Sequence, residues 1–157
     1  WAKLTEGETL HPEVARAAAR RWLELGGEPG RALQWLMPQW QDWLQQPDAL
    51  DEADRQGLAV VFEQALGALP PDADWLQRLE RASQQWPQQA ELAYLSACVF
   101  MRHSLWGKAQ QALERCAPRL NDARLRRRAW VRLAELAEQR GDSAAAALHW
   151  KKAAQSG

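Results

Sequence analysis

Five arginines within residues 124–132 are the densest set of side chains that could bind a ligand. Arg124, Arg128 and Arg132 recur every four residues, so on a helix they lie along one face. The planar guanidinium donates two parallel hydrogen bonds to a carboxylate, so this face would suit an acidic segment or a peptide C-terminus. The alternative is a solvated face with ion pairs to Glu135 and Glu138. Arg126 and Arg127 complete the run.

Tryptophan is unusually frequent, with 10 residues in a chain of 157. Most of them fall on apolar stripes of predicted helices, where large rings fill the space between helices and leave their N–H at an edge. We therefore interpret them as packing residues. The alternative is an aromatic surface for a ligand such as a porphyrin, for which Trp35, Trp40 and Trp43 around Pro38 are the best candidates.

The residues that usually carry catalysis or metal binding do not form a recognisable site. Cys98 and Cys116 lie among apolar residues, where free cysteine packs as a small hydrophobe. This pattern favours a reducing compartment. His11, His103 and His149 have no partner at metal-ligand spacing, so we expect structural roles rather than haem ligation. HExxH, P-loop and GxSxG motifs are absent, and we expect no enzymatic activity and no cofactor.

The composition predicts an all-α fold. The chain contains no Ile, five Val and two Thr, whereas strands favour β-branched residues. Hydrophobic residues make up 46% of the chain although its mean hydropathy is −0.56, as expected for amphipathic helices. Residues 1–90 carry a net charge of −6 and residues 91–157 carry +6. A pI near 7.0 and the lack of a recognisable nucleic-acid-recognition motif argue against nucleic-acid binding.

Proline, glycine and acidic residues divide the chain into eight predicted helices. Residues 1–8 form a lead-in, Pro38 should kink or split the second helix, and Gly26-Gly27 and Gly141-Asp142 make turns. Short connections between helices favour antiparallel pairs. We therefore expect one helical-repeat domain over residues 1–157, with hairpins at about 10–45, 49–86, 87–118 and 121–155.

A repeat of 37 residues links the last two hairpins. Ala97, Ala109, Leu113 and Cys116 correspond to Ala134, Ala146, Trp150 and Ala153. Small residues fall where paired helices approach closely, and larger apolar residues where a neighbour is filled. Tetratricopeptide repeats have this pattern, with a period of about 34 residues. We therefore predict an α-α superhelix of about four hairpins, a tetratricopeptide-repeat-like solenoid.

The repeat register predicts a partner-binding groove lined by the first helix of each hairpin. Leu95 and Cys98 stand where a carboxylate clamp would need polar donors, so a complete clamp is not expected. Affinity would come from apolar burial with a few charged hydrogen bonds. The groove candidates are Tyr94, Cys98, Met101, Arg102, Arg128, Arg132 and Glu135.

The string Leu105-Trp106-Gly107-Lys108-Ala109-Gln110, with Gly141-Asp142 and Lys151-Lys152-Ala153-Ala154, resembles the C-terminal tetratricopeptide region of the bacterial HemY family. The Ala32-Leu33-Gln34-Trp35-Leu36 segment is also similar. The resemblance implies an inner-membrane protein with an N-terminal membrane anchor that this chain lacks. It also implies a repeat domain on the cytoplasmic face and an association with late haem biosynthesis.

Taken together, these features predict a non-catalytic protein-protein interaction module that scaffolds partner enzymes, which would include those of haem biosynthesis. Two alternatives remain open. One is a protein that binds or handles a tetrapyrrole such as haem or a porphyrin. The other is a homo-oligomeric structural module.

Overall fold

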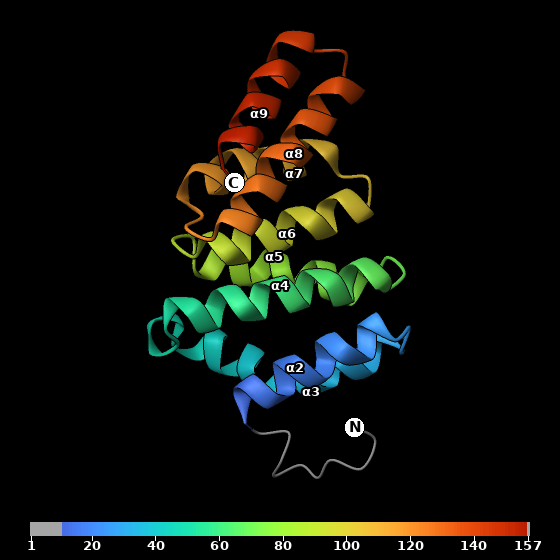
Figure 1. The fold of residues 1–157 in the computed structure, drawn as a ribbon, viewed down its shortest axis with the longest axis vertical. Helices are drawn as coiled ribbons and strands as arrows, with labels where there is room; N and C mark the ends of the chain where they lie inside the picture. Colours follow the sequence, from blue (N-terminus) through green and yellow to red (C-terminus); the bar gives the residue numbers. More distant parts are fainter. Residues whose placement is uncertain (1–10, 157) are drawn as a thin grey trace. The chain divides into compact units, whose positions relative to one another are not determined.

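The computed structural model describes residues 11–156, which form eight α-helices and two short 3-10 helices and contain no strand. The predicted all-α fold is confirmed (Figure 1). Within the described residues, no helix is long and apolar enough to cross a membrane. The chain divides into two compact units, residues 1–72 and 73–157, and the predicted hairpin 49–86 spans this division. The two units are therefore described separately.

The first unit contains three α-helices, in which α4 packs against both helices of an α2–α3 hairpin. Gly26 closes the hairpin at φ 79°, a conformation that glycine adopts at little cost. The next residue, Gly27, lies under the Trp22 indole, which donates a hydrogen bond to the Glu28 carbonyl at 2.8 Å. The elements are α2 (Pro12–Glu24), α3 (Pro29–Gln45), the 3-10 helix η1 (Pro47–Ala49) and α4 (Glu52–Ala68).

A polar network fastens the three helices of the first unit together. The Arg16 guanidinium in α2 donates to Gln39 Oε1 in α3 at 2.8 Å and pairs with Asp54 Oδ1 in α4 at 2.9 Å. Gln39 in turn donates to the Pro12 carbonyl. The Arg16 side chain is 13% exposed, so its charge is largely removed from water and depends on these partners.

Of the two effects expected of Pro38, a kink or a split, the split does not occur, because α3 continues through it. Because proline has no backbone N–H, the Gln34 carbonyl lacks its usual helical donor at position 38. Both Gln34 and Pro38 are exposed. Water can therefore satisfy that carbonyl. On the opposite side, Leu36, Trp40 and Trp43 are buried and hold both halves of the helix to the core.

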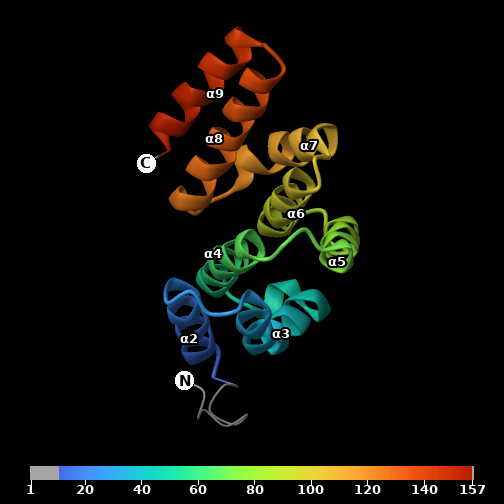
Figure 2. The same cartoon turned by 90° about the vertical axis from the view of Figure 1, so that its right-hand side faces the viewer.

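The second unit contains five α-helices arranged around α6, whose residues 90–100 are all buried. The Ser96 hydroxyl donates to the Leu79 carbonyl, which ties α6 to α5. α6 pairs with α7, and α8 pairs with α9 (Figures 1 and 2). The elements are α5 (Ala73–Gln85), α6 (Ala90–Arg102), α7 (Trp106–Cys116), the 3-10 helix η2 (Ala117–Arg119), α8 (Ala123–Gln139) and α9 (Ser143–Gln155).

The packing in the second unit follows the predicted 37-residue register, with one exception. Small residues at the predicted close approaches are buried, as is Leu113. Trp150, which corresponds to Leu113, is instead 38% exposed, and its Nε1 donates to Glu138 Oε1 at 2.7 Å. The expectation that Trp150 fills a neighbour is therefore wrong in this structure. The buried small residues are Ala97, Ala109, Cys116, Ala134, Ala146 and Ala153.

Candidate protein-interaction surface

Arg132 in α8 reaches across to α6 and brings together three of the predicted groove residues. Its Nε donates to the Tyr94 hydroxyl at 3.3 Å, and its Nη1 lies 3.8 Å from the Met101 sulfur. The guanidinium carbon also lies 5.9 Å from the centre of the Tyr94 ring, within the range of a cation–π interaction. Arg132 is therefore directed toward α6, the first helix of the preceding hairpin.

Two of the predicted groove residues are not available to a partner. Tyr94 is 0% exposed and Cys98 is 7% exposed. Tyr94 does face Arg132, but both side chains are covered, so their assignment to an open groove is wrong. Of the remaining candidates, Met101 and Arg132 are half-buried, whereas Arg102, Arg128 and Glu135 are exposed. We refer to these five residues as the Arg132 surface.

The arginine run does not act as one ligand face. Arg124 pairs with Asp122, the N-cap of α8, with Nη2 2.9 Å from Oδ2. Arg126 donates to the Leu120 carbonyl at 3.1 Å and to the Ser156 carbonyl at 3.3 Å, and so joins the start of α8 to the end of α9. Arg124 and Arg126 thus have structural partners within the second unit, as Arg132 does through Tyr94.

The same contacts set the electrostatics of the α8 N-terminus. The hydrogen bond from Arg124 lowers the pKa of Asp122, and backbone N–H donors from Arg124 and Leu125 lower it further, against the opposing effect of burial. The pKa of Arg124 is raised by the same pair. A carboxylate at this position also complements the positive end of the helix dipole. Asp122 is therefore held ionised as a cap.

The tryptophans proposed as an aromatic ligand surface are largely enclosed. Trp40 and Trp43 are 3% and 0% exposed and meet edge to face, with ring centroids 6.2 Å apart. Trp35 is half-buried and packs edge to face against Trp22 at 5.8 Å, and Arg31 covers both rings. The packing interpretation is confirmed for these rings, and Trp40 and Trp43 offer no open face to a ligand.

Both cysteines are free and buried, as predicted. Burial raises the pKa of the Cys116 thiol to about 12, with a further contribution from Cys98. A thiol at that pKa is almost entirely protonated near neutral pH and is a poor nucleophile.

The three histidines lie at separate places. His11 is the N-cap residue of α2, His103 is the C-cap residue of α6, and His149 stacks on Trp130 in the last hairpin. Burial lowers the pKa of His149, and the nearby positive charge of Arg140 lowers it further. Across residues 11–156, no group of three or more His, Cys, Asp or Glu side chains could hold a metal ion.

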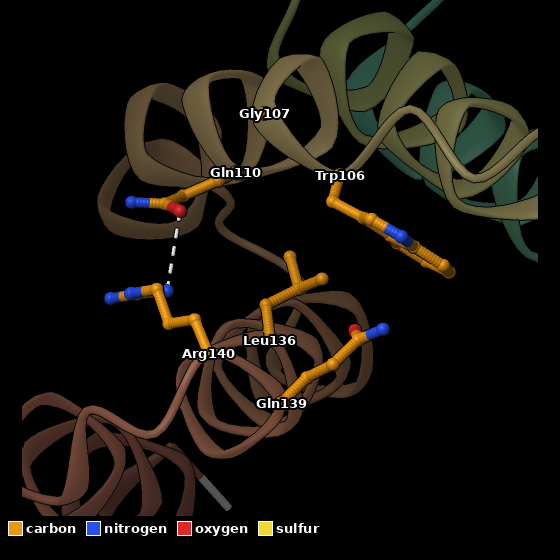
Figure 3. A pocket seen from close by; sticks show the side chains of 6 residues that line it. All are labelled: Trp106, Gly107, Gln110, Leu136, Gln139 and Arg140. Carbon is orange, nitrogen blue, oxygen red and sulfur yellow. Dashed lines mark hydrogen bonds between the residues drawn. The ribbon is translucent and has the colours of Figure 1, made fainter.

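A pocket of about 310 Å³ lies between α7 and α8 and was not anticipated from the sequence. Figure 3 shows Gln110 from α7 and Arg140 from α8 directed toward each other, with Nη1 donating to Oε1 at 3.2 Å. Trp106, at 41% exposure, provides an accessible ring beside them. The available signal was the string at residues 105–110, which carried the family resemblance but did not by itself indicate a pocket. Gly107, Leu136 and Gln139 complete the lining.

Comparisons of the chain with protein-family models, with curated proteins and with solved structures found no match.

Proposed function

We propose that the chain is a non-catalytic, tetratricopeptide-type module that binds protein partners through the Arg132 surface. The observation that supports this is the anchoring of Arg132 between α8 and α6, with exposed cationic side chains beside it. Arg128 precedes Arg132 by one helical turn, and Arg102 directly follows Met101. A held guanidinium with neighbouring arginines suits an acidic segment of a partner, because preorganised donors lose less entropy on binding.

The resemblance to the HemY family suggests the context of this binding. We propose that the module belongs to a membrane-anchored, HemY-like protein of the bacterial inner membrane. Its repeat domain would lie on the cytoplasmic face and scaffold enzymes of late haem or porphyrin biosynthesis. The acidic segment that we expect at the Arg132 surface would then belong to one of those enzymes.

A comparative capture experiment tests this proposal. The wild-type chain and an Arg128→Glu variant would be immobilised and exposed to bacterial membrane extract, with bound proteins quantified by mass spectrometry. Arg127→Glu is the matched control, because it makes the same charge change at the adjacent exposed position on a different face of α8. We expect a set of proteins to be depleted by Arg128→Glu and retained by Arg127→Glu. Equal recovery on all three baits would contradict the assignment of the surface.

Tetrapyrrole binding is the alternative function. Two of the three tryptophans of its candidate site, Trp40 and Trp43, are enclosed and offer no open face. A titration with haem that monitors its absorbance band and the tryptophan fluorescence separates the two functions. The proposed module leaves both signals unchanged apart from dilution and inner-filter effects. A saturable shift of the haem band would replace the interaction function with tetrapyrrole handling.

A further inference from the structure

One side of α9 is a largely apolar helix face that is exposed to solvent, although the Trp150 indole at its margin also donates to Glu138 in α8. We define the α9 outer face as six exposed residues, of which three are alanines and only one is charged. α9 contains no acidic residue, and it packs chiefly against α8. An exposed helix face normally carries more charge, so this composition indicates a surface suited to contact with another helix. The residues are Ser143, Ala144, Ala147, Trp150, Lys151 and Ala154.

The 37-residue register shows what normally covers such a face. In the preceding hairpin, Gly107 and Gln110 of α7 line the pocket between α7 and α8, and they correspond to Ala144 and Ala147. Likewise Leu113, which is 0% exposed, corresponds to the partly exposed Trp150. The α7 positions that line the contact with α8 therefore correspond to exposed alanines on α9.

The chain contains a second open face that corresponds to the other half of the same interface. The α2–α3 and α8–α9 hairpins have the same turn, because Gly26 and Gly141 both have φ 79° and each follows its helix with the same pattern of hydrogen bonds. At this offset of 115 residues, Leu136, Gln139 and Arg140, which line the α7–α8 pocket, correspond to Arg21, Glu24 and Leu25.

We define the α2 outer face by these three positions and by Glu13 and Val14, two turns before Arg21. Leu25 is 64% exposed and Val14 is 37% exposed, so the face retains apolar side chains in contact with solvent. Four of the six exposed large hydrophobic residues among residues 11–156 belong to α2, its cap residue or α9. The α2 outer face consists of Glu13, Val14, Arg21, Glu24 and Leu25.

Charge favours contact between these two faces over contact between two copies of either one. Residues 1–72 carry 6 Lys+Arg and 12 Asp+Glu, whereas residues 73–157 carry 14 and 8, so the two units have net charges of −6 and +6. Locally, Lys151 replaces Glu114 in the 37-residue register, and Glu13 replaces Arg128 at the offset of 115. Glu13 and Lys151 would therefore bring opposite charges to the two sides of this interface.

We propose that copies of this chain associate head to tail, with the α9 outer face of one copy packed against the α2 outer face of the next. The α2 helix would lie on α9 as α8 lies on α7, with Glu13 toward Lys151. This interface joins two different surfaces, so each dimer keeps one open face of each kind and can add further copies. The proposed interface contains no residue of the Arg132 surface. The inference is therefore independent of the proposed function.

Light scattering and sedimentation across a range of concentrations test the proposal. The wild-type average mass is expected to rise past that of a dimer and to fall when salt is added, because salt screens the charges of the two units. Ala147→Glu would block the α9 face and Leu25→Glu the α2 face, each by placing a carboxylate against apolar surface. Each variant alone is expected to associate at least about tenfold more weakly than the wild type.

The decisive experiment mixes the Ala147→Glu and Leu25→Glu variants. One variant keeps an intact α2 face and the other an intact α9 face, so an equimolar mixture is expected to form a dimer that grows no further. Ala53→Glu and Ala123→Glu are matched controls at exposed alanines outside both faces and should associate like the wild type. Circular dichroism melts establish that each variant is folded.

Several results would overturn the head-to-tail arrangement. A wild type that stays monomeric at all concentrations excludes it. If Leu25→Glu still dimerises while Ala147→Glu does not, the contact joins two α9 faces instead. A mixture that stays monomeric also contradicts it. Should either variant unfold, Glu13→Lys provides a second test: it should weaken association, and Glu13→Lys with Lys151→Glu in one chain should restore it.

Discussion

Arg132 Nε in α8 donates a hydrogen bond to Tyr94 Oη in α6 at 3.3 Å, and its guanidinium lies against the same ring. This contact joins two successive hairpins of the second unit. We expect a double-mutant cycle with Arg132→Met and Tyr94→Phe to give a coupling free energy of about 1 kcal/mol from urea unfolding. Additive effects of the two substitutions would show that the contact contributes nothing to stability.

The Asp122 cap should make the second unit sensitive to acid. Since the pKa of Asp122 is lowered in the folded chain, its contribution to stability is present above the pKa of the unfolded carboxyl and is lost as the pH falls through the folded value. Asp122→Ala should cost about 1 kcal/mol at pH 7. Urea unfolding at several pH values should show the difference from the wild type shrinking below about pH 4.

Asp122→Asn is the matched control for that experiment. Asparagine keeps the capping oxygen but loses the charge pair with Arg124, so it should retain most of the stability at pH 7 and show a weaker dependence on acid. An Asp122→Ala cost that is the same at pH 3 and pH 7 would be inconsistent with the capping role.

The glycine beneath Trp22 should not tolerate even a methyl group. A Cβ added at Gly27 would overlap Trp22 Cε2, so the indole or the turn must move. We expect Gly27→Ala to destabilise the first unit by roughly 1–3 kcal/mol in thermal or urea unfolding. Gly67→Ala in α4 is the control, because open space surrounds that position and alanine favours helix. Equal effects of the two substitutions would disprove the role assigned to Trp22.

Cysteine reactivity should report unfolding of the second unit. With burial raising the pKa of Cys116 to about 12, the thiolate is scarce in the folded chain. We expect alkylation by iodoacetamide at pH 8 to be slow in buffer and fast in urea, in a Cys98→Ala background that isolates Cys116. Rapid labelling in buffer would mean that α7 opens readily or that the thiol is not buried.

His149 should make stability fall on mild acidification. Its pKa is lowered from 6.5 by burial, so the unfolded chain binds more protons below that value. Its contribution to stability is therefore complete above about pH 6.5 and declines as the pH falls below it. His149→Phe keeps an aromatic ring against Trp130 but cannot be protonated. We expect urea unfolding between pH 7.5 and 5 to show a smaller loss of stability in this variant, and parallel curves would refute the prediction.

The amino-acid sequence determined the helices of this protein. Pro12 and Pro29 mark helix starts, Asp122 caps α8, and the glycines at 26 and 141 end helices, all through local backbone chemistry. The 37-residue register likewise predicted which small residues are buried, because close packing of paired helices requires small side chains at fixed spacing.

Only the tertiary structure decided which helix faces are covered. Tyr94 and Cys98 were expected to line an open groove but are buried, whereas Trp150 matches a core position and remains partly exposed. The tertiary structure also decided the role of Arg126, because its guanidinium donates to the Leu120 and Ser156 carbonyls, which the fold brings together. Helical periodicity assigns a residue to a face of its own helix, but the exposure of that face depends on helices elsewhere in the chain.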